Sequence, residues 1–163
     1  MKVPEKTTIT ITTGGKPIEG VPVKLIFEMA KKNHHIFVFG PSDSSGTINV
    51  TADEIRREAR KTMELFLMDF TDIEAHWTGR LRIVPMNRQA IKAALSAFRQ
   101  FRSFKFPANY EQMLLAADAI LSRIPTAKLE ASVRSEPDKK LTLEAVPVQA
   151  EEEVSAGSDS RPN

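Results

Sequence analysis

Residues 80–105 of this 163-residue chain carry seven basic side chains and no acidic one. From position 88 to position 102 the cations are spaced by 4, 7 and 3 residues, which places them close to one face of a helix. Aromatic rings lie between them, and cations interleaved with rings can hold a phosphate backbone and stack bases. If this segment binds a partner, the candidate residues are Arg80, Arg82, Arg88, Lys92, Arg99, Phe101, Arg102, Phe104 and Lys105.

The same pattern is typical of an ordinary amphipathic helix, with Phe98 and Phe101 buried and the cations solvated. A further interpretation is internal pairing with the acidic stretch from Glu64 to Glu74, because the net charge of the whole chain is only +2. We prefer the interpretation of the basic segment as an ordinary amphipathic helix and keep binding of an anionic partner as the alternative.

A second candidate site lies in the acidic stretch. In an extended segment Asp72, Glu74 and His76 share a face, and with Asp69 they could bind a divalent cation. A solvated loop explains this spacing equally well. The chain also has no nucleophile elbow, no phosphate loop, no His-Glu-x-x-His motif and no cysteine. We therefore expect a protein that is not an enzyme and has no cofactor, with a metal-dependent hydrolase as the remote alternative.

These residues must be positioned by strands and helices that the hydrophobic pattern predicts. Alternating apolar residues indicate strands over residues 7–13, 21–29, 35–39, 47–51 and 79–85. Thr51 and Glu54 have the spacing of a capping box, so a helix should begin there. We favour a short helix followed by a strand over Met63–Phe70, although helical spacing also continues to its end.

After residue 86 the period changes to that of helices. Asn87 and Asn109 are the expected N-caps of two amphipathic helices, joined as an αα-hairpin. Two alternating runs, 127–134 and 139–148, then predict a β-hairpin. The expected organisation is α+β: an antiparallel β-sandwich core (1–86), a helical hairpin (87–125), a β-hairpin (126–148) and a disordered acidic tail (149–163).

Two segments in the first third of the chain carry a known pattern. The segment from Gly15 to Leu25 reads Gly-Lys-Pro-Ile-Glu-Gly-Val-Pro-Val-Lys-Leu, and Ser42 to Val50 reads Ser-Asp-Ser-Ser-Gly-Thr-Ile-Asn-Val. Over residues 7–51 the chain thus resembles the carboxypeptidase-regulatory-like, or transthyretin-like (prealbumin-like), β-sandwich domains. The resemblance implies an immunoglobulin-like sandwich and says little about function, because this fold has many uses.

The functional expectation is a non-enzymatic intracellular binding or assembly module. Its partner, another protein or a second copy, would contact the helical hairpin and the basic segment. The alternative is binding of nucleic acid or another anionic polymer through the same segment. No apolar run reaches the length of a membrane span, and the first residues do not resemble a signal peptide. We expect a cytoplasmic protein, with export after removal of a leader as the alternative.

Overall fold

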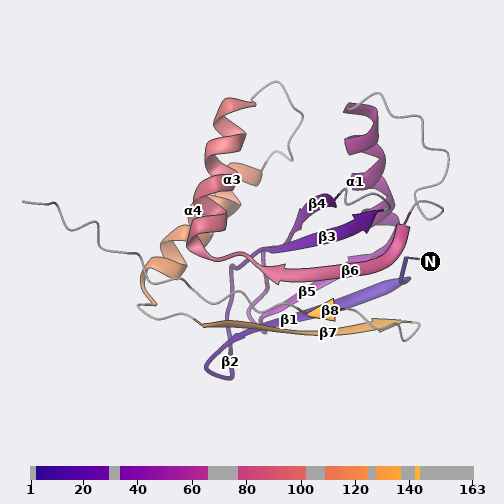
Figure 1. Ribbon diagram of the computed structural model, residues 1–163. Coiled ribbons are helices and arrows are strands. Elements are labelled where there is room, and N and C mark those ends of the chain that lie inside the picture. Colours follow the sequence, from indigo (N-terminus) through magenta and orange to yellow (C-terminus); the bar gives the residue numbers. More distant parts are fainter. Residues whose placement is uncertain are drawn as a thin grey trace, which may run out of the picture.

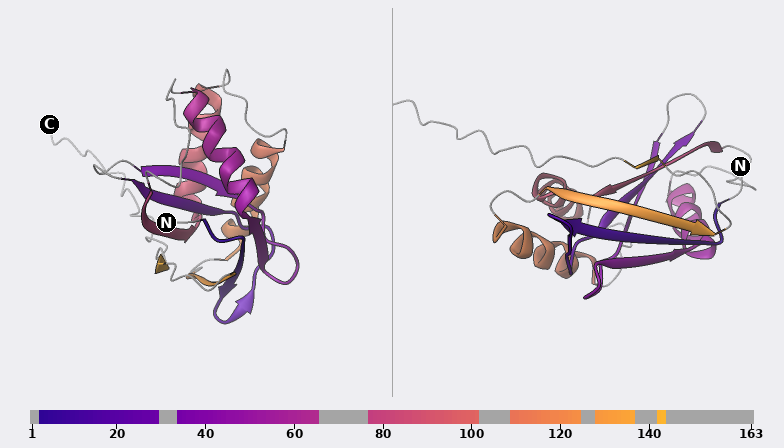
Figure 2. Two further views of the ribbon diagram at one scale, coloured as in Figure 1. Left: turned by 90° about the vertical axis from the view of Figure 1, so that its right-hand side faces the viewer. Right: turned by 90° about the horizontal axis from the view of Figure 1, so that it is seen from below.

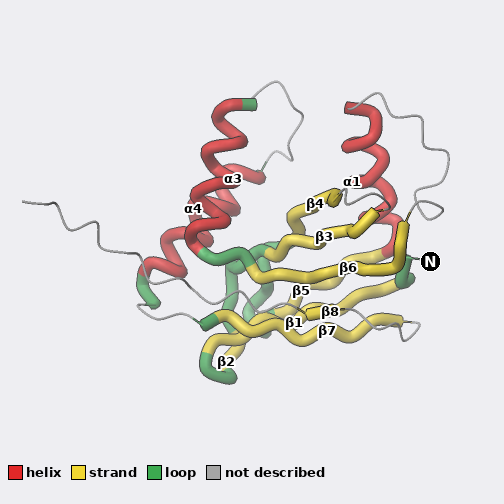
Figure 3. The backbone as a smooth tube through the Cα atoms, viewed as in Figure 1, coloured by secondary structure: helices red, strands yellow, loops and turns green. Residues whose placement is uncertain are grey.

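The computed structural model describes residues 3–29, 34–65, 77–101, 109–124, 128–136 and 142–143 of the chain. Within these ranges the protein is a mixed α+β fold with two sheets and three helices (Figure 1, Figure 3). In Figure 1 the sheet that contains β1 lies below the sheet that contains β3, and α1 and α3 rise above the upper sheet at opposite ends.

The first sheet is built around β1 (Lys6–Thr13), which pairs antiparallel with each of the remaining strands of the sheet. The longest of these pairings is with β7 (Leu129–Glu136), along the whole of β1. The others are with β5 (Thr47–Thr51) and the short β2 (Lys16–Pro17). Gly14 and Gly15 join β1 to β2 as the predicted turn, with φ of 56° and 76°. Glycine adopts these positive φ values at little cost, which explains why two glycines occupy this turn.

The second sheet has the order β4–β3–β6–β8. The strands β4 (His34–Phe39), β3 (Val23–Met29) and β6 (Trp77–Pro85) pair antiparallel, whereas β8 (Thr142–Leu143) lies parallel to β6. The five strands predicted over residues 7–13, 21–29, 35–39, 47–51 and 79–85 are present, and their ends fall within two residues of the expected limits.

The predicted β-hairpin over 126–148 is wrong in the described residues, because β7 and β8 pair with strands of different sheets. Alternation identifies a strand but not the edge with which it pairs. Ser135 and Glu136 follow the first alternating run, and in the structure they belong to β7, which continues to Glu136 along β1.

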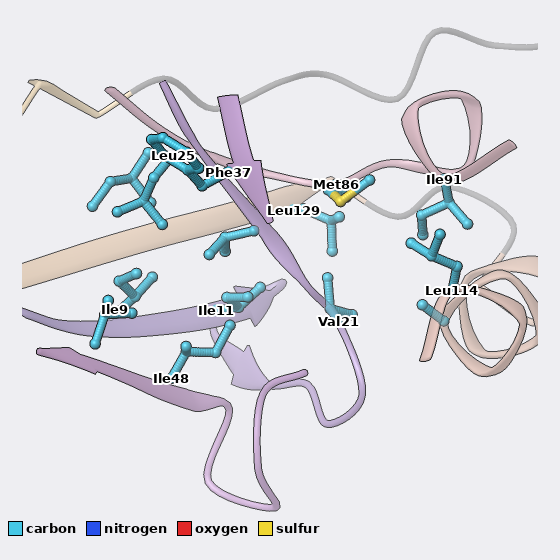
Figure 4. Close-up of a cluster of buried hydrophobic side chains, with 14 of the residues drawn as sticks. Ile9, Ile11, Val21, Leu25, Phe37, Ile48, Met86, Ile91, Leu114 and Leu129 are labelled. Atoms are coloured by element: carbon cyan, nitrogen blue, oxygen red, sulfur yellow. The ribbon is translucent and has the colours of Figure 1, made fainter. Parts of the chain in front are cut away.

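One buried cluster contains side chains from both sheets (Figure 4). Ile9 and Ile11 of β1 contribute from the first sheet, and Leu25 and Phe37 of β3 and β4 contribute from the second. These residues are at most 5% exposed, as their alternation predicted. At the end of β6 the cluster continues through Val21, Met86, Ile91 and Leu114 to the helices, so strands and helices share one core.

The loop before β5 explains the second sequence signature. The buried Ser42 hydroxyl donates to the Ile18 carbonyl at 2.7 Å and accepts from the Val21 amide at 3.0 Å, so it ties two loops together. The Asp43 carboxylate accepts from the Ser45 hydroxyl at 2.6 Å and from the backbone amides of Ser45 and Thr47. These bonds, with the Ser45 hydroxyl first, lower the pKa of Asp43. The signature is therefore structural.

Helix α1 (Ala52–Leu65) begins with the predicted capping box. The Glu54 carboxylate accepts from the Thr51 amide at 2.8 Å, and the Thr51 hydroxyl accepts from the Glu54 amide at 3.2 Å. The strand predicted from Met63 is wrong up to Leu65, since these residues belong to α1. Once a helix has started, each further residue adds a hydrogen bond at little cost, and this outweighs a weak β preference. Residues 66–70 lie outside the described ranges.

Helices α3 (Arg88–Gln100) and α4 (Tyr110–Ser122) begin at the predicted positions. Asn87 caps α3 by accepting from the Ala90 amide at 2.8 Å. The expected side-chain cap at Asn109 is wrong, because its side chain makes no capping hydrogen bond and its backbone is not extended (φ −102°, ψ 12°). The predicted tail, 149–163, lies outside the described residues.

Candidate functional site

The basic residues of α3 face acidic residues of α4. Arg88 Nε donates to Asp118 Oδ1 at 3.0 Å, and both side chains are about one-third exposed. Arg99 Nε lies 3.8 Å from Glu111 Oε1, in a more exposed pair. Arg88 is at the start of α3 and Asp118 is near the end of α4, while Arg99 and Glu111 are at the opposite ends. The two helices therefore run antiparallel along this contact.

The inner side of the helix pair is apolar. Ile91 of α3 and Leu114 of α4 are fully buried in the common core. The rings of Phe98 and Tyr110 lie 5.9 Å apart, and burial raises the pKa of Tyr110. Figure 2 shows both helices gathered at one end of the sheets. The helices are thus fixed to the sheets by burial, which leaves their opposite side available for other contacts.

A glycine in the loop before β3 lies against a side chain of α4. Gly20 has a φ of 85°, and a methyl group added there would overlap the Cδ1 atom of Ile120. A side chain at position 20 would therefore meet backbone strain, and the end of the Ile120 side chain would have to move aside. The resemblance of residues 7–51 to a known domain includes this glycine, and in this protein Gly20 has the positive φ that glycine tolerates and contacts Ile120 of α4.

The outer side of the helix pair has an exposed leucine between charges. Leu115 is 46% exposed, and it lies four residues after Glu111 and three before Asp118, so all three share one face of α4. Lys92 takes the corresponding place on α3, between Arg88 and Arg99, and is also exposed. We call this area the seam surface; its residues are Arg88, Lys92, Arg99, Glu111, Leu115 and Asp118.

The structure brings together only part of the basic segment that the sequence singled out. Arg88, Lys92 and Arg99 share the seam side of α3, whereas Arg82 is half-buried on β6 in the second sheet. Phe101, expected to be buried, is 44% exposed and is the C-cap residue of α3. The backbone of Arg80 is in β6, and Arg102, Phe104 and Lys105 lie outside the described residues.

Sequence reasoning missed the acids that pair with these cations. We considered internal pairing with residues 64–74, but in the described residues Arg88 and Arg99 pair with Asp118 and Glu111. The signal was present in the sequence, because Glu111 and Asp118 are seven residues apart and so share a face of α4, with Leu115 between them.

The proposed metal ligands Asp69, Asp72, Glu74 and His76 lie outside the described ranges. In the part of the chain that the structure covers, no three histidine or carboxylate side chains are grouped closely enough to hold a metal ion. The described helices also include none that is both long and apolar enough to cross a membrane.

Comparison of the chain with protein-family models, with curated proteins and with solved structures gave no match. The resemblance of residues 7–51 to transthyretin-like domains therefore stays a prediction from the sequence. The seam surface is the part of the described structure from which function can be argued.

Proposed function

We propose that this protein is a non-enzymatic binding or assembly module that contacts another protein through the seam surface. The observation that carries the proposal is Leu115, an exposed leucine flanked on both sides by an ion pair between helices. Protein interfaces typically bury an apolar centre inside a polar rim that excludes water. Leu115 supplies such a centre, and the two ion pairs supply such a rim.

The fold proposed for this module is a transthyretin-like β-sandwich that carries α3 and α4 as a helical hairpin. Two mainly antiparallel sheets that share one buried cluster support the sandwich, and so do the two sequence signatures. The antiparallel contact of α3 with α4 supports the hairpin. A rigid scaffold that presents a separate binding element is a common arrangement, because binding residues need a fixed geometry.

The ion pairs favour a protein partner over an anionic polymer. A polyanion that bound the seam side of α3 would have to compete with Asp118 for Arg88 and with Glu111 for Arg99. It would also approach two carboxylates that repel it. A protein with an apolar residue for Leu115 and charges of both signs for the rim has no such conflict.

Affinity capture with the tagged full chain tests the proposal. Native complexes are collected with and without nuclease, using the wild type, Leu115→Lys and the matched control Leu143→Lys, whose leucine is also 46% exposed but lies on β8. We expect a protein that survives nuclease, is retained by Leu143→Lys and is lost from Leu115→Lys. A partner that Leu115→Lys captures as well as the wild type does would contradict the proposal.

A column of immobilised nucleic acid tests the alternative. A polymer bound through the basic segment should be released steeply by salt, and Arg99→Glu should shorten retention. The proposed protein-binding function instead predicts that retention is weak and unchanged by Arg99→Glu.

A further inference from the structure

We propose that the seam surface binds a second copy of this chain, so that the protein forms a symmetric dimer; this inference rests on the proposed function. The observation that carries it is the division of charge between the two helices. The seam side of α3 is wholly basic, with Arg88, Lys92 and Arg99, whereas the seam side of α4 contributes the acids Glu111 and Asp118.

This division makes the surface complementary to itself. A two-fold axis parallel to the helices places α3 of one copy over α4 of the other. Because rotation about this axis does not change a residue's position along the helix direction, each residue of one copy lies at the same height as its equivalent in the other. Because Arg88 lies level with Asp118 in one chain, it then faces the partner's Asp118, and Arg99 likewise faces the partner's Glu111. The contact is isologous, so each such pair occurs twice.

The dimer would extend existing interactions rather than break them. In one chain Arg99 and Glu111 are 59% and 40% exposed, so both keep room for a second partner. On dimerisation each guanidinium lies between two carboxylates, and such networks are more stabilising than isolated surface pairs. The self-complementary arrangement is also specific, because an axis that placed α3 over α3 would bring like charges together.

Leu115 occupies the centre of this arrangement. It lies between the two ion pairs on α4, as Lys92 does on α3, so each Leu115 meets the hydrocarbon stem of the partner's Lys92. The neighbouring exposed positions Ser96 and Ala119 are small, which lets the two helix pairs approach closely. The dimer thus covers the exposed leucine of the seam surface with apolar atoms.

Sedimentation velocity of the full chain tests the dimer directly, in a loading series from about 1 to 100 μM. We expect the wild type and Leu143→Lys to shift from monomer to dimer across the series, and Leu115→Lys to stay monomeric. Circular dichroism should show all three folded, because both leucines are exposed. A wild type that is monomeric throughout, or a dimer that Leu115→Lys leaves intact, would overturn the inference.

A charge-swapped chain tests the geometry. It combines Arg88→Asp, Arg99→Glu, Glu111→Arg and Asp118→Arg, so that both ion pairs are kept within the chain with their signs reversed. Its own dimer stays complementary, but in a mixed dimer with the wild type each of these positions faces a like charge. The four substitutions leave the mass of the chain unchanged, so the charge-swapped chain is labelled with ¹⁵N. Native mass spectrometry of the mixture should then show at least about tenfold fewer mixed dimers than random pairing gives. Free mixing refutes the proposed contact.

The two proposals fail separately. If the wild type is monomeric but Leu115→Lys still loses a captured protein, the second-copy inference is wrong and the proposed function stands. If the wild type is monomeric and Leu115→Lys changes no capture, both are wrong. A dimer that depends on Leu115 supports both, because the second copy is then a protein partner bound through the seam surface.

Discussion

Replacing Thr7 by valine should stabilise the protein. Thr7 lies on β1 with its side chain fully buried, opposite Val50 of β5 and Ser135 of β7. Its Oγ1 is the one buried side-chain oxygen or nitrogen in the described residues that has no hydrogen-bond partner. Valine has nearly the same shape and keeps the β-branched side chain, so the substitution removes the hydroxyl and little else.

The size of the effect follows from the cost of that hydroxyl. A buried polar group without a partner costs about 1–3 kcal/mol relative to one that is solvated or bonded. We take the lower end, because neighbouring side chains relax around a new methyl group, and expect a gain of about 1 kcal/mol. For a chain of this size that gain raises the Tm by about 2–4 °C.

Two control variants separate the hydroxyl from packing. Thr7→Ser keeps the hydroxyl but removes a buried methyl group, so the free energy of unfolding should fall by about 1 kcal/mol. Thr8→Val makes the same chemical change on the next residue, where the hydroxyl donates to Asn49 Oδ1 at 3.0 Å, and should be neutral or destabilising. Urea unfolding followed by circular dichroism measures all three. A Thr7→Val variant less stable than the wild type would refute the argument.

Further predictions concern the elements that position the helices. Gly20→Ala should lower the free energy of unfolding by about 1–2 kcal/mol, mainly through backbone strain at φ 85°, because the flexible end of the Ile120 side chain can move away from the new methyl group. Gly14→Ala, with φ 56° and open space around it, should cost only about 1 kcal/mol, and thermal denaturation compares the two. Glu54→Ala should cost about 1 kcal/mol by removing the capping box, read from urea unfolding. Because the pKa of Asp43 is lowered in the fold, its stabilising effect is present above the ordinary aspartate pKa and is lost as pH falls through the lowered one. Acid titration of Asp43→Asn should therefore show a shallower loss of stability than the wild type, and an unchanged slope would contradict the assignment.

The strands could be predicted because a period of two residues is a local property. Ile9 and Ile11 already identified the buried side of β1, and Gly14 and Gly15 identified its turn. Pairing is not local, so β7 was assigned to a hairpin although it lies along β1. The C-terminal end of α1 is hard to predict for a different reason, because the residues of its last turn suit a helix and a strand equally well.

The site could be predicted only in part. The spacing of Arg88, Lys92 and Arg99 placed them on one side of a helix, which the structure confirms. Their acidic partners depend on how α4 is rotated against α3, and that rotation follows from burial of Leu114 rather than from spacing within α3. Leu115 stood outside the apolar stripe expected for α4, and this position is what leaves it exposed.

The excess of positive charge in residues 80–105 has a different meaning once α4 is considered with it. On the seam surface three cations face two carboxylates, which leaves one positive charge on a surface of mixed sign. A polyanion site requires an excess of cations that are available for phosphates, and its affinity falls steeply with salt. A surface on which rows of opposite charge lie side by side instead favours a partner with the same two rows in reverse order. Two copies of this chain related by a two-fold axis meet that requirement, with Leu115 as the apolar centre. Because partly exposed ion pairs each contribute little and Leu115 supplies an apolar centre, salt should weaken this association less steeply than it weakens polyanion binding.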